Sequence, residues 1–251
     1  MAAGDPAAPA LVLLHGVGVN SMHWRFQFAA LADRFRVVAW NAPGYLLSDN
    51  LRAETPGFDD YAGALEDFLG ALGIGRFAVL GNSFGTRVAQ AFAYRHPGRV
   101  TQAVFTGTSI AQGMTQEERA RTLAAREAMI ARGSFAFAAR AEALLGSRAS
   151  PETRALVEHT LRATNGRGFL QAARFIAAAD IPPVGAGLSM PLLLIQGAED
   201  RVAPAERNAV RLKEAVPGAR LVTLDGCGHL PEAEMPERVN ALLREFLADA
   251  G

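Results

Sequence analysis

The chain has one cysteine, one lysine and no net charge. The single cysteine and the zero net charge each argue against particular classes of function. Because Cys227 is the only cysteine, an internal disulfide and a metal site built from thiolates are ruled out. The 25 basic and 25 acidic side chains cancel, so the net charge gives no reason to expect nucleic acid or an anionic membrane as a partner. Lys213 is the only lysine beside abundant arginine and alanine, which we interpret as the coding bias of a GC-rich bacterial genome.

A long hydrophobic run is also missing. The first ten residues, MAAGDPAAPA, carry neither a basic start nor an apolar stretch, so they do not resemble a signal peptide. The run from Leu11 to Leu14 is far too short to cross a bilayer. We therefore expect a soluble cytoplasmic protein whose partner is a small molecule. We expect no metal and no cofactor, and the sequence does not indicate an oligomeric state.

The 251 residues, half of them hydrophobic, suit one large domain or one domain with an insertion. Short apolar runs alternate with helical patterns, which predicts an α/β fold with a mostly parallel sheet between two layers of helices. The strands are expected at 11–14, 36–40, 77–80, 100–106, 192–196 and 220–224. The helices between them are expected at about 23–33, 59–72, 84–95, 204–215 and 236–248.

The alternation stops after the fourth expected strand, where only helical patterns are found. Thr115 and Glu118 have the spacing of a capping box, and Ser150 before Pro151 is typical of a helix start. Residues 110–188 are therefore predicted to be a helical insertion into a core made of residues 1–109 and 189–251. Long insertions in compact domains are usually functional, so we expect a lid over an active site in preference to an elaborate loop.

Ser83 is the first candidate for chemistry, within Gly81-Asn82-Ser83-Phe84-Gly85. A G-x-S-x-G pattern alone is common, and an ordinary glycine-rich turn is the alternative. Here it directly follows an apolar strand and opens a helix, which is the setting of a nucleophile elbow. The flanking glycines would permit a strained turn that projects the serine hydroxyl above the sheet.

A serine hydroxyl needs a base, and His229 is the best placed of five histidines. It lies in Asp225-Gly226-Cys227-Gly228-His229, between the last strand and the last helix. The alternatives are weaker: His15 lies at a strand end, His23 and His96 lie at helix edges, and His159 is expected on a solvated helix face, although it could touch substrate.

Asp200 is the predicted orienting acid, because it follows the fifth strand and completes the chain order Ser, Asp, His. Glu199 is its neighbour and its competitor. An oxyanion needs two backbone donors, and we predict the amides of Phe84 and Val17. Gly16, Gly18 and Asn82 are predicted to contact substrate, the glycines because they allow the backbone to approach closely.

With these motifs in order, the chain resembles the α/β-hydrolase family over nearly its whole length. The matching segments are LLHGVG at 13–18, Trp24, WNAPGYLLSD at 40–49, GNSFG at 81–85, GAEDRVAP at 197–204 and GCGHLPE at 226–232. The resemblance implies an acyl-enzyme mechanism with Ser83 as nucleophile, His229 as base and Asp200 as its orienter, under a helical cap. Within the family the chain looks most like 3-oxoadipate enol-lactonase and related small esterases. Asn82 is similar to the residue before the serine in the meta-cleavage-product hydrolases, which cut carbon–carbon bonds.

Two positions depart from the family pattern. Only ten residues precede the strand that ends at His15, so the usual first antiparallel hairpin is expected to be missing or reduced. Asn41 stands where family members usually have aspartate, and we draw no functional inference from it.

Hydrolysis of a carboxylic ester or lactone is the leading functional hypothesis. Carbon–carbon hydrolysis is the second enzyme hypothesis, and a ligand-binding protein on a hydrolase fold is the alternative from another class. The insertion holds ten arginines and seven acids, an excess that would favour an anionic substrate. Solvated helix faces are the plainer explanation for most of these arginines.

Overall fold

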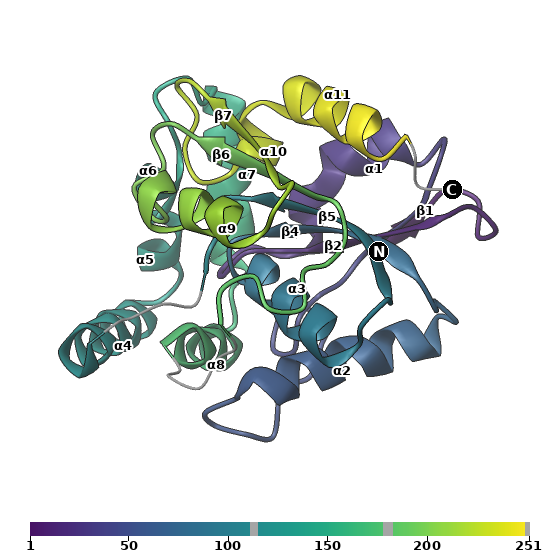
Figure 1. Ribbon diagram of the computed structural model, residues 1–251. Helices are drawn as coiled ribbons and strands as arrows, with labels where there is room; N and C mark the ends of the chain where they lie inside the picture. Colours follow the sequence, from purple (N-terminus) through teal and green to yellow (C-terminus); the bar gives the residue numbers. More distant parts are fainter. Residues whose placement is uncertain (111–114, 178–182, 249–251) are drawn as a thin grey trace.

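A computed structural model describes residues 1–110, 115–177 and 183–248. Seven strands form one sheet in the order β1-β3-β2-β4-β5-β6-β7, and every neighbouring pair is parallel except β1 with β3. The strands are β1 (Ala2–Ala3), β2 (Ala10–Leu14), β3 (Arg36–Ala39), β4 (Phe77–Asn82), β5 (Val100–Thr106), β6 (Leu192–Gly197) and β7 (Arg220–Leu224). The expected α/β fold with a mostly parallel sheet is confirmed, and Figure 1 shows the sheet between its helices.

Apolar strand residues are buried on both faces of this sheet, which explains why the central strands are continuous hydrophobic runs. On one face the core includes residues of α1 (Arg25–Leu31) and α11 (Pro236–Phe246). On the other it includes residues of α2 (Phe58–Ala71), α3 (Phe84–Arg95) and α9 (Ala209–Ala215). Figure 1 shows these two helical layers above and below the sheet.

The sheet edge keeps only a remnant of the expected first hairpin. Ala2 and Ala3 pair antiparallel with Val38 and Val37 of β3, and no strand of the described residues precedes them. In the described residues the antiparallel edge is one two-residue strand, which the sequence did not reveal because two alanines carry no strand pattern.

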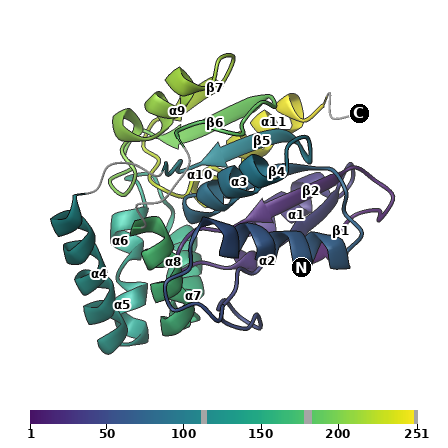
Figure 2. The ribbon, with the colours of Figure 1, turned by 60° about the horizontal axis from the view of Figure 1, so that its bottom comes forward.

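The described residues between β5 and β6, which are direct neighbours in the sheet, form five helices. They are α4 (Gln116–Ala131), α5 (Ser134–Ala138), α6 (Ala141–Leu144), α7 (Pro151–Arg162) and α8 (Gly166–Ala177). We call them the cap, and Figure 2 shows them gathered on one side of the molecule. The expected capping box is formed, because Glu118 N donates to Thr115 Oγ1 at 3.2 Å and Thr115 N donates to Glu118 Oε2 at 2.8 Å.

Two expected helices are shorter than the sequence pattern suggested. The segment 23–33 is a 3₁₀ turn, Ser21–Trp24, followed by α1, and the segment 204–215 is likewise a 3₁₀ turn, Ala205–Arg207, followed by α9. The four-residue helix α10 (Pro231–Glu234) was not expected at all. No helix in the described part of the chain is long and apolar enough to cross a membrane.

Candidate active site

A cavity of about 660 Å³ lies between the cap and the carboxyl ends of the strands. From the core it is lined by residues of the loops that follow β2, β5, β6 and β7 and by the junction of β4 with α3. From the cap it is lined by α4, α6 and α8. Ser83, His229 and Val17 are among the lining residues, so three of the residues singled out in the sequence face one space.

Ser83 occupies a strained turn between β4 and α3. Its φ of 50° and ψ of −109° lie outside the regions that ordinary residues favour. The turn is held by Ser83 N, which donates to Thr106 O at 3.1 Å, and by Thr86 N and Oγ1, which donate to Ser83 O at 3.0 and 2.6 Å. Within the segment 81–85 only Ser83 is not fully buried, so the strain presents this side chain to the cavity.

The glycines on either side of Ser83 are required by close backbone contacts. A Cβ at Gly85 would lie 2.0 Å from Leu14 O, and one at Gly81 would lie 2.9 Å from the carbonyl carbon of Gly85. Helix α3 therefore packs too closely on β2 for a side chain at Gly85, and too closely on the end of β4 for a side chain at Gly81. The sharp turn and its two glycines together have the form of a nucleophile elbow.

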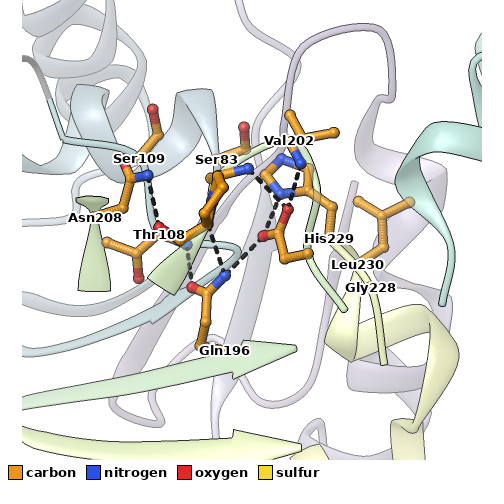
Figure 3. Close-up of polar contacts among 12 residues, drawn as sticks. Ser83, Thr108, Ser109, Gln196, Val202, Asn208, Gly228, His229 and Leu230 are labelled. Carbon is orange, nitrogen blue, oxygen red and sulfur yellow. Dashed lines mark hydrogen bonds and ion pairs between the residues drawn. The ribbon is translucent and has the colours of Figure 1, made fainter. Parts of the chain in front are cut away.

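His229 is paired with Asp200 at the edge of the same cavity. The distance from His229 Nδ1 to Asp200 Oδ2 is 2.7 Å, and both side chains are almost completely buried. Because Nδ1 faces a carboxylate, it carries the proton, which leaves Nε2 as the ring acceptor. Figure 3 shows His229 with Ser83 and Gln196 and the hydrogen bonds of this region.

Four donors surround the Asp200 carboxylate. Oδ1 accepts from Val202 N at 2.9 Å and from Ala203 N at 2.8 Å, while Oδ2 accepts from Gln196 Nε2 at 2.7 Å as well as from His229. Burial by itself would raise the pKa of Asp200, but the charge and hydrogen bond of His229 and the two backbone amides outweigh it. The pKa of Asp200 is therefore lowered, and the carboxylate is ionised at neutral pH.

The competing acid, Glu199, points elsewhere. It is exposed, and its two carboxylate oxygens accept from the backbone amide and the hydroxyl of Ser147 in the cap, each at 2.7 Å. Those bonds lower the pKa of Glu199, but they connect it to the cap and not to an imidazole. Of the two neighbouring carboxylates, only Asp200 contacts His229.

The remaining histidines have other surroundings. His15 is buried, its Nε2 accepts from Ala42 N at 3.1 Å, and burial lowers its pKa to about 4, so it is a neutral structural group. His23 forms a fully buried pair with Glu232 at 2.6 Å, and His96 stacks on Phe92. His159 is exposed and does not line the cavity.

The loop that carries His229, residues 225–229, is fixed from three sides, and we call it the histidine loop. His229 N donates to Leu144 O of the cap at 2.7 Å, and His229 O accepts from Asn82 Nδ2 at 3.0 Å. The Glu234 carboxylate accepts from Gly228 N and Leu230 N on either side of the histidine. Burial raises the pKa of Glu234, and its hydrogen bonds to these amides oppose that change.

Asn82 was expected to contact substrate, and the structure shows a different set of contacts. Its side chain is fully buried at the floor of the cavity, and its amide nitrogen donates to Thr106 and to His229 O. Asn82 therefore positions the histidine loop, and nothing in these contacts requires a substrate.

The loop after β2 lies directly against the elbow. A Cβ on Gly16 would be 3.4 Å from Ser83 Cβ, and both Gly16 and Val17 line the cavity. Phe84 is the first residue of α3, and the first amides of a helix have no partner within it. Gly18 is different, since it does not line the cavity and its φ of +89° and missing Cβ make room for cap side chains.

Ser83 and His229 meet in one cavity but are not bonded. No hydrogen bond between Ser83 Oγ and His229 Nε2 is found among the described residues, and such contacts are often long before substrate binds. No group of three or more His, Cys, Asp or Glu side chains in this part of the chain is arranged to hold a metal ion.

Gln196 and Glu234 are functional neighbours that sequence reasoning missed. Gln196 is a polar residue at the end of the apolar run LLLIQ, and that interruption was the available signal for a side chain aimed at the site. Glu234 lies among three other acids between 232 and 245, and nothing in the sequence distinguishes it from them.

Comparison with known proteins agrees with this geometry. A model of the alpha/beta hydrolase fold matches residues 9–233. The chain is 31% identical to a 2-hydroxy-6-oxononadienedioate/2-hydroxy-6-oxononatrienedioate hydrolase of Burkholderia vietnamiensis, covering 95% of this chain and 86% of the relative. It is 26% identical to 3-oxoadipate enol-lactonase 2 of Acinetobacter baylyi, covering 97% and 91%. A thermophilic esterase from Thermogutta terrifontis, solved with malate bound, superposes with a TM-score of 0.87 at 25% identity, covering 99% and 92%.

Proposed function

The chain belongs to the α/β-hydrolase fold family and is a hydrolase, and we propose that it cleaves a carboxylic ester or lactone through an acyl-enzyme on Ser83. One observation carries this proposal. The strained, accessible Ser83 faces the same cavity as an imidazole whose Nδ1 is already bonded to a buried carboxylate. That combination supplies a nucleophile, a base and an orienting acid.

Acylation begins when Ser83 Oγ attacks the carbonyl carbon of the substrate. A C–O bond forms, the carbonyl π electrons move to its oxygen, and the serine proton passes to His229 Nε2. When the tetrahedral intermediate collapses, the bond to the leaving oxygen breaks and His229 returns the proton to it. An ester releases an alcohol, whereas a lactone yields a ring-opened acyl-enzyme that still carries its hydroxyl group.

The oxyanion is stabilised by the backbone amides of Phe84 and Val17. The Phe84 amide lies at the N-terminus of α3, where a partial positive charge favours a developing anion. The loop of Val17 is adjacent to Ser83 through Gly16. Water then attacks the acyl-enzyme with His229 as base, and Ser83 is released as the leaving group.

Carbon–carbon hydrolysis is the second candidate, because the 31% identical relative is a hydrolase of that kind of substrate. The two reactions share the proposed residues and differ in the bond that is cut. A panel of p-nitrophenyl esters, lactones and ring-cleavage products separates them. Turnover of ring-cleavage products with little activity on aryl esters would replace the ester proposal. The ligand-binding alternative receives no support from the three proteins compared above, each of which is named as an enzyme.

Covalent labelling tests the central role of Ser83. A fluorophosphonate should label the purified protein rapidly and stoichiometrically, and Ser83→Ala should abolish the label while thermal unfolding shows a folded protein. Another serine of comparable environment is available as a control, because Ser109 also lines the cavity but lies outside the elbow. Labelling that survives in Ser83→Ala and disappears in Ser109→Ala would refute the assignment.

A further inference from the structure

The cavity that contains Ser83 is strongly cationic, although the chain as a whole is neutral. Six arginines line it, and Glu118 is the only carboxylate among its described lining residues. The arginines are Arg87, Arg121, Arg126, Arg140, Arg207 and Arg211. A concave site lined by one sign of charge concentrates ligands of the opposite sign.

The six arginines differ in what they contact. Arg87 already has acceptors within the protein. Its guanidinium donates to Ser109 Oγ, Ile110 O and Ile176 O. Arg121, Arg207 and Arg211 are exposed at the rim of the cavity. The two that remain, Arg126 and Arg140, lie deeper and define the candidate binding site.

Arg126 of α4 and Arg140 at the start of α6 are partly buried around one aromatic ring. Their guanidinium carbons lie 5.6 and 5.3 Å from the centroid of the Phe169 ring. Arg140 donates one hydrogen bond, from Nη1 to Val17 O at 3.1 Å, and Arg126 donates none to the described residues. Neither has a carboxylate partner in this part of the chain, so most of their N–H donors have no acceptor in the protein.

Two cations placed together without a counter-charge are unfavourable in a partly buried site. Burial and then the charge of Arg126 lower the pKa of Arg140 to about 9, and burial also lowers the pKa of Arg126. Both therefore remain charged at neutral pH, and the pair has the charge and the free N–H donors that an anion-binding site requires. Guanidinium groups bind planar oxyanions through paired hydrogen bonds.

The site lies close to the proposed nucleophile. The loop after β2 lies between the two. At one end, a Cβ added to Gly18 would lie 2.7 Å from Arg140 Nη1, and at the other, a Cβ added to Gly16 would lie 3.4 Å from Ser83 Cβ. Gly16 and Gly18 are at most about 7 Å apart in extended chain, so Arg140 and Ser83 lie against the same short loop, and both line the same cavity.

We propose that Arg126 and Arg140 bind a carboxylate of the substrate, so that the enzyme prefers esters or lactones that carry a carboxylate over neutral ones of similar length. This inference rests on the proposed function, since it concerns the same cavity. Inorganic phosphate has related chemistry and is the other source of an anion that the experiment must distinguish.

A matched pair of substrates tests the preference. The p-nitrophenyl monoester of glutaric acid carries the carboxylate, and p-nitrophenyl pentanoate is a neutral analogue of similar length. The wild-type protein should have the higher kcat/KM for the glutarate ester. Arg126→Gln should reduce the ratio of the two kcat/KM values by about 10- to 100-fold, the range expected for losing a hydrogen bond to a charged group. Arg140→Gln should do the same and should also slow both substrates, because it releases Val17.

Arg132→Gln is the matched control. Arg132 caps the C-terminus of the same helix as Arg126, is exposed and does not line the cavity, so removing its charge should leave the ratio unchanged. A wild-type preference for the neutral ester would overturn the proposal. Equal losses on both substrates in Arg126→Gln would overturn it as well, because the side chain would then be structural.

Binding without turnover separates this inference from the proposed function. Glutarate should raise the thermal unfolding temperature of the Ser83→Ala protein, Arg126→Gln should remove that effect, and phosphate at the same concentration should give a smaller one. If glutarate binds in this way but no ester or lactone is hydrolysed, the anion site stands and the proposed function fails. If esters are hydrolysed but phosphate stabilises as much as glutarate, the carboxylate site is wrong while the proposed function stands.

Discussion

Replacing Asp200 by asparagine exchanges one carboxylate oxygen for an NH₂ group at a position where every neighbour is a donor. If the amide oxygen keeps the backbone donors Val202 N and Ala203 N, the new NH₂ group faces His229 Nδ1 and Gln196 Nε2. If the amide is flipped, the NH₂ group faces the two backbone amides instead. Neither orientation satisfies all four contacts.

Gln196 cannot relieve this conflict by turning over. Its Oε1 accepts from Thr108 N at 3.1 Å and its Nε2 also donates to Ala203 O at 3.0 Å, so a flip would break both bonds. The imidazole of His229 has to respond by carrying its proton on Nε2 and accepting at Nδ1. In that tautomer Nε2 cannot take the proton of Ser83.

The structure sets the size of the effect. Loss of one charged hydrogen bond amounts to about 1.5–3 kcal/mol, or roughly 10- to 150-fold. A reversed tautomer raises the loss to about 10⁴-fold in serine hydrolases that have been tested in this way. We therefore expect Asp200→Asn to lower kcat by between about 10-fold and about 10⁴-fold. Unsatisfied buried donors should also lower the unfolding temperature by roughly 2–10 °C.

The assay is steady-state hydrolysis of a p-nitrophenyl ester, with thermal unfolding followed in parallel. Glu199→Gln is the matched control, because it removes a neighbouring charge that contacts only Ser147 of the cap. It should keep kcat within about twofold. The reasoning is refuted if Glu199→Gln is the damaging change, or if Asp200→Asn retains more than about a tenth of kcat.

Three further predictions concern the supports of the site. Gln196→Met removes a donor to Asp200 and should lower kcat about 10- to 100-fold. Gln171→Met removes another buried glutamine, one that bonds to backbone carbonyls, and should lower only the unfolding temperature. Equal losses of kcat in the two variants would contradict this. Ser83→Gly should unfold about 2–4 °C above Ser83→Ala because it relieves the positive φ, and an identical temperature would show that the turn is not strained. Gly146→Ala should displace the histidine loop, because its Cβ would lie within 2.6 Å of that loop, and should lower kcat at least about tenfold. Gly63→Ala is the control: its Cβ meets no atom within 4 Å, so kcat should be unchanged.

The sequence predicted the sheet well because each central strand is buried on both faces. A run such as Leu11–Leu14, with every side chain fully buried, is typical of such a strand, and the turn signals on either side of it favour a strand over a helix. The edge strand β1 was missed because its pairing with β3 depends on backbone hydrogen bonds between residues without side-chain preference. The short helix α10 was missed for a related reason, since four residues are too few to show a helical period.

The site was predictable where one residue type is demanded by chemistry and by backbone shape together. Ser83 between two glycines is such a position, and the contacts of Gly81 and Gly85 show why no other residue fits beside it. Gln196, Glu234 and Arg140 were not predicted, because each acts through a partner that only the fold brings near. Gly18 leaves room for Arg140, and its expected contact with substrate stays a prediction.

The cap contributes to the geometry of the proposed catalytic residues as well as to the walls of the cavity. Leu144 O of the cap accepts from His229 N, and Arg140 donates to Val17 O. Thr164, just after α7, donates from its hydroxyl to Gly18 O at 2.7 Å. The cap therefore holds both the loop of the proposed base and the loop of a proposed oxyanion donor. Substitutions in the segment 140–164 should for this reason change kcat as well as KM, whereas a cap that only selected substrates would change KM alone.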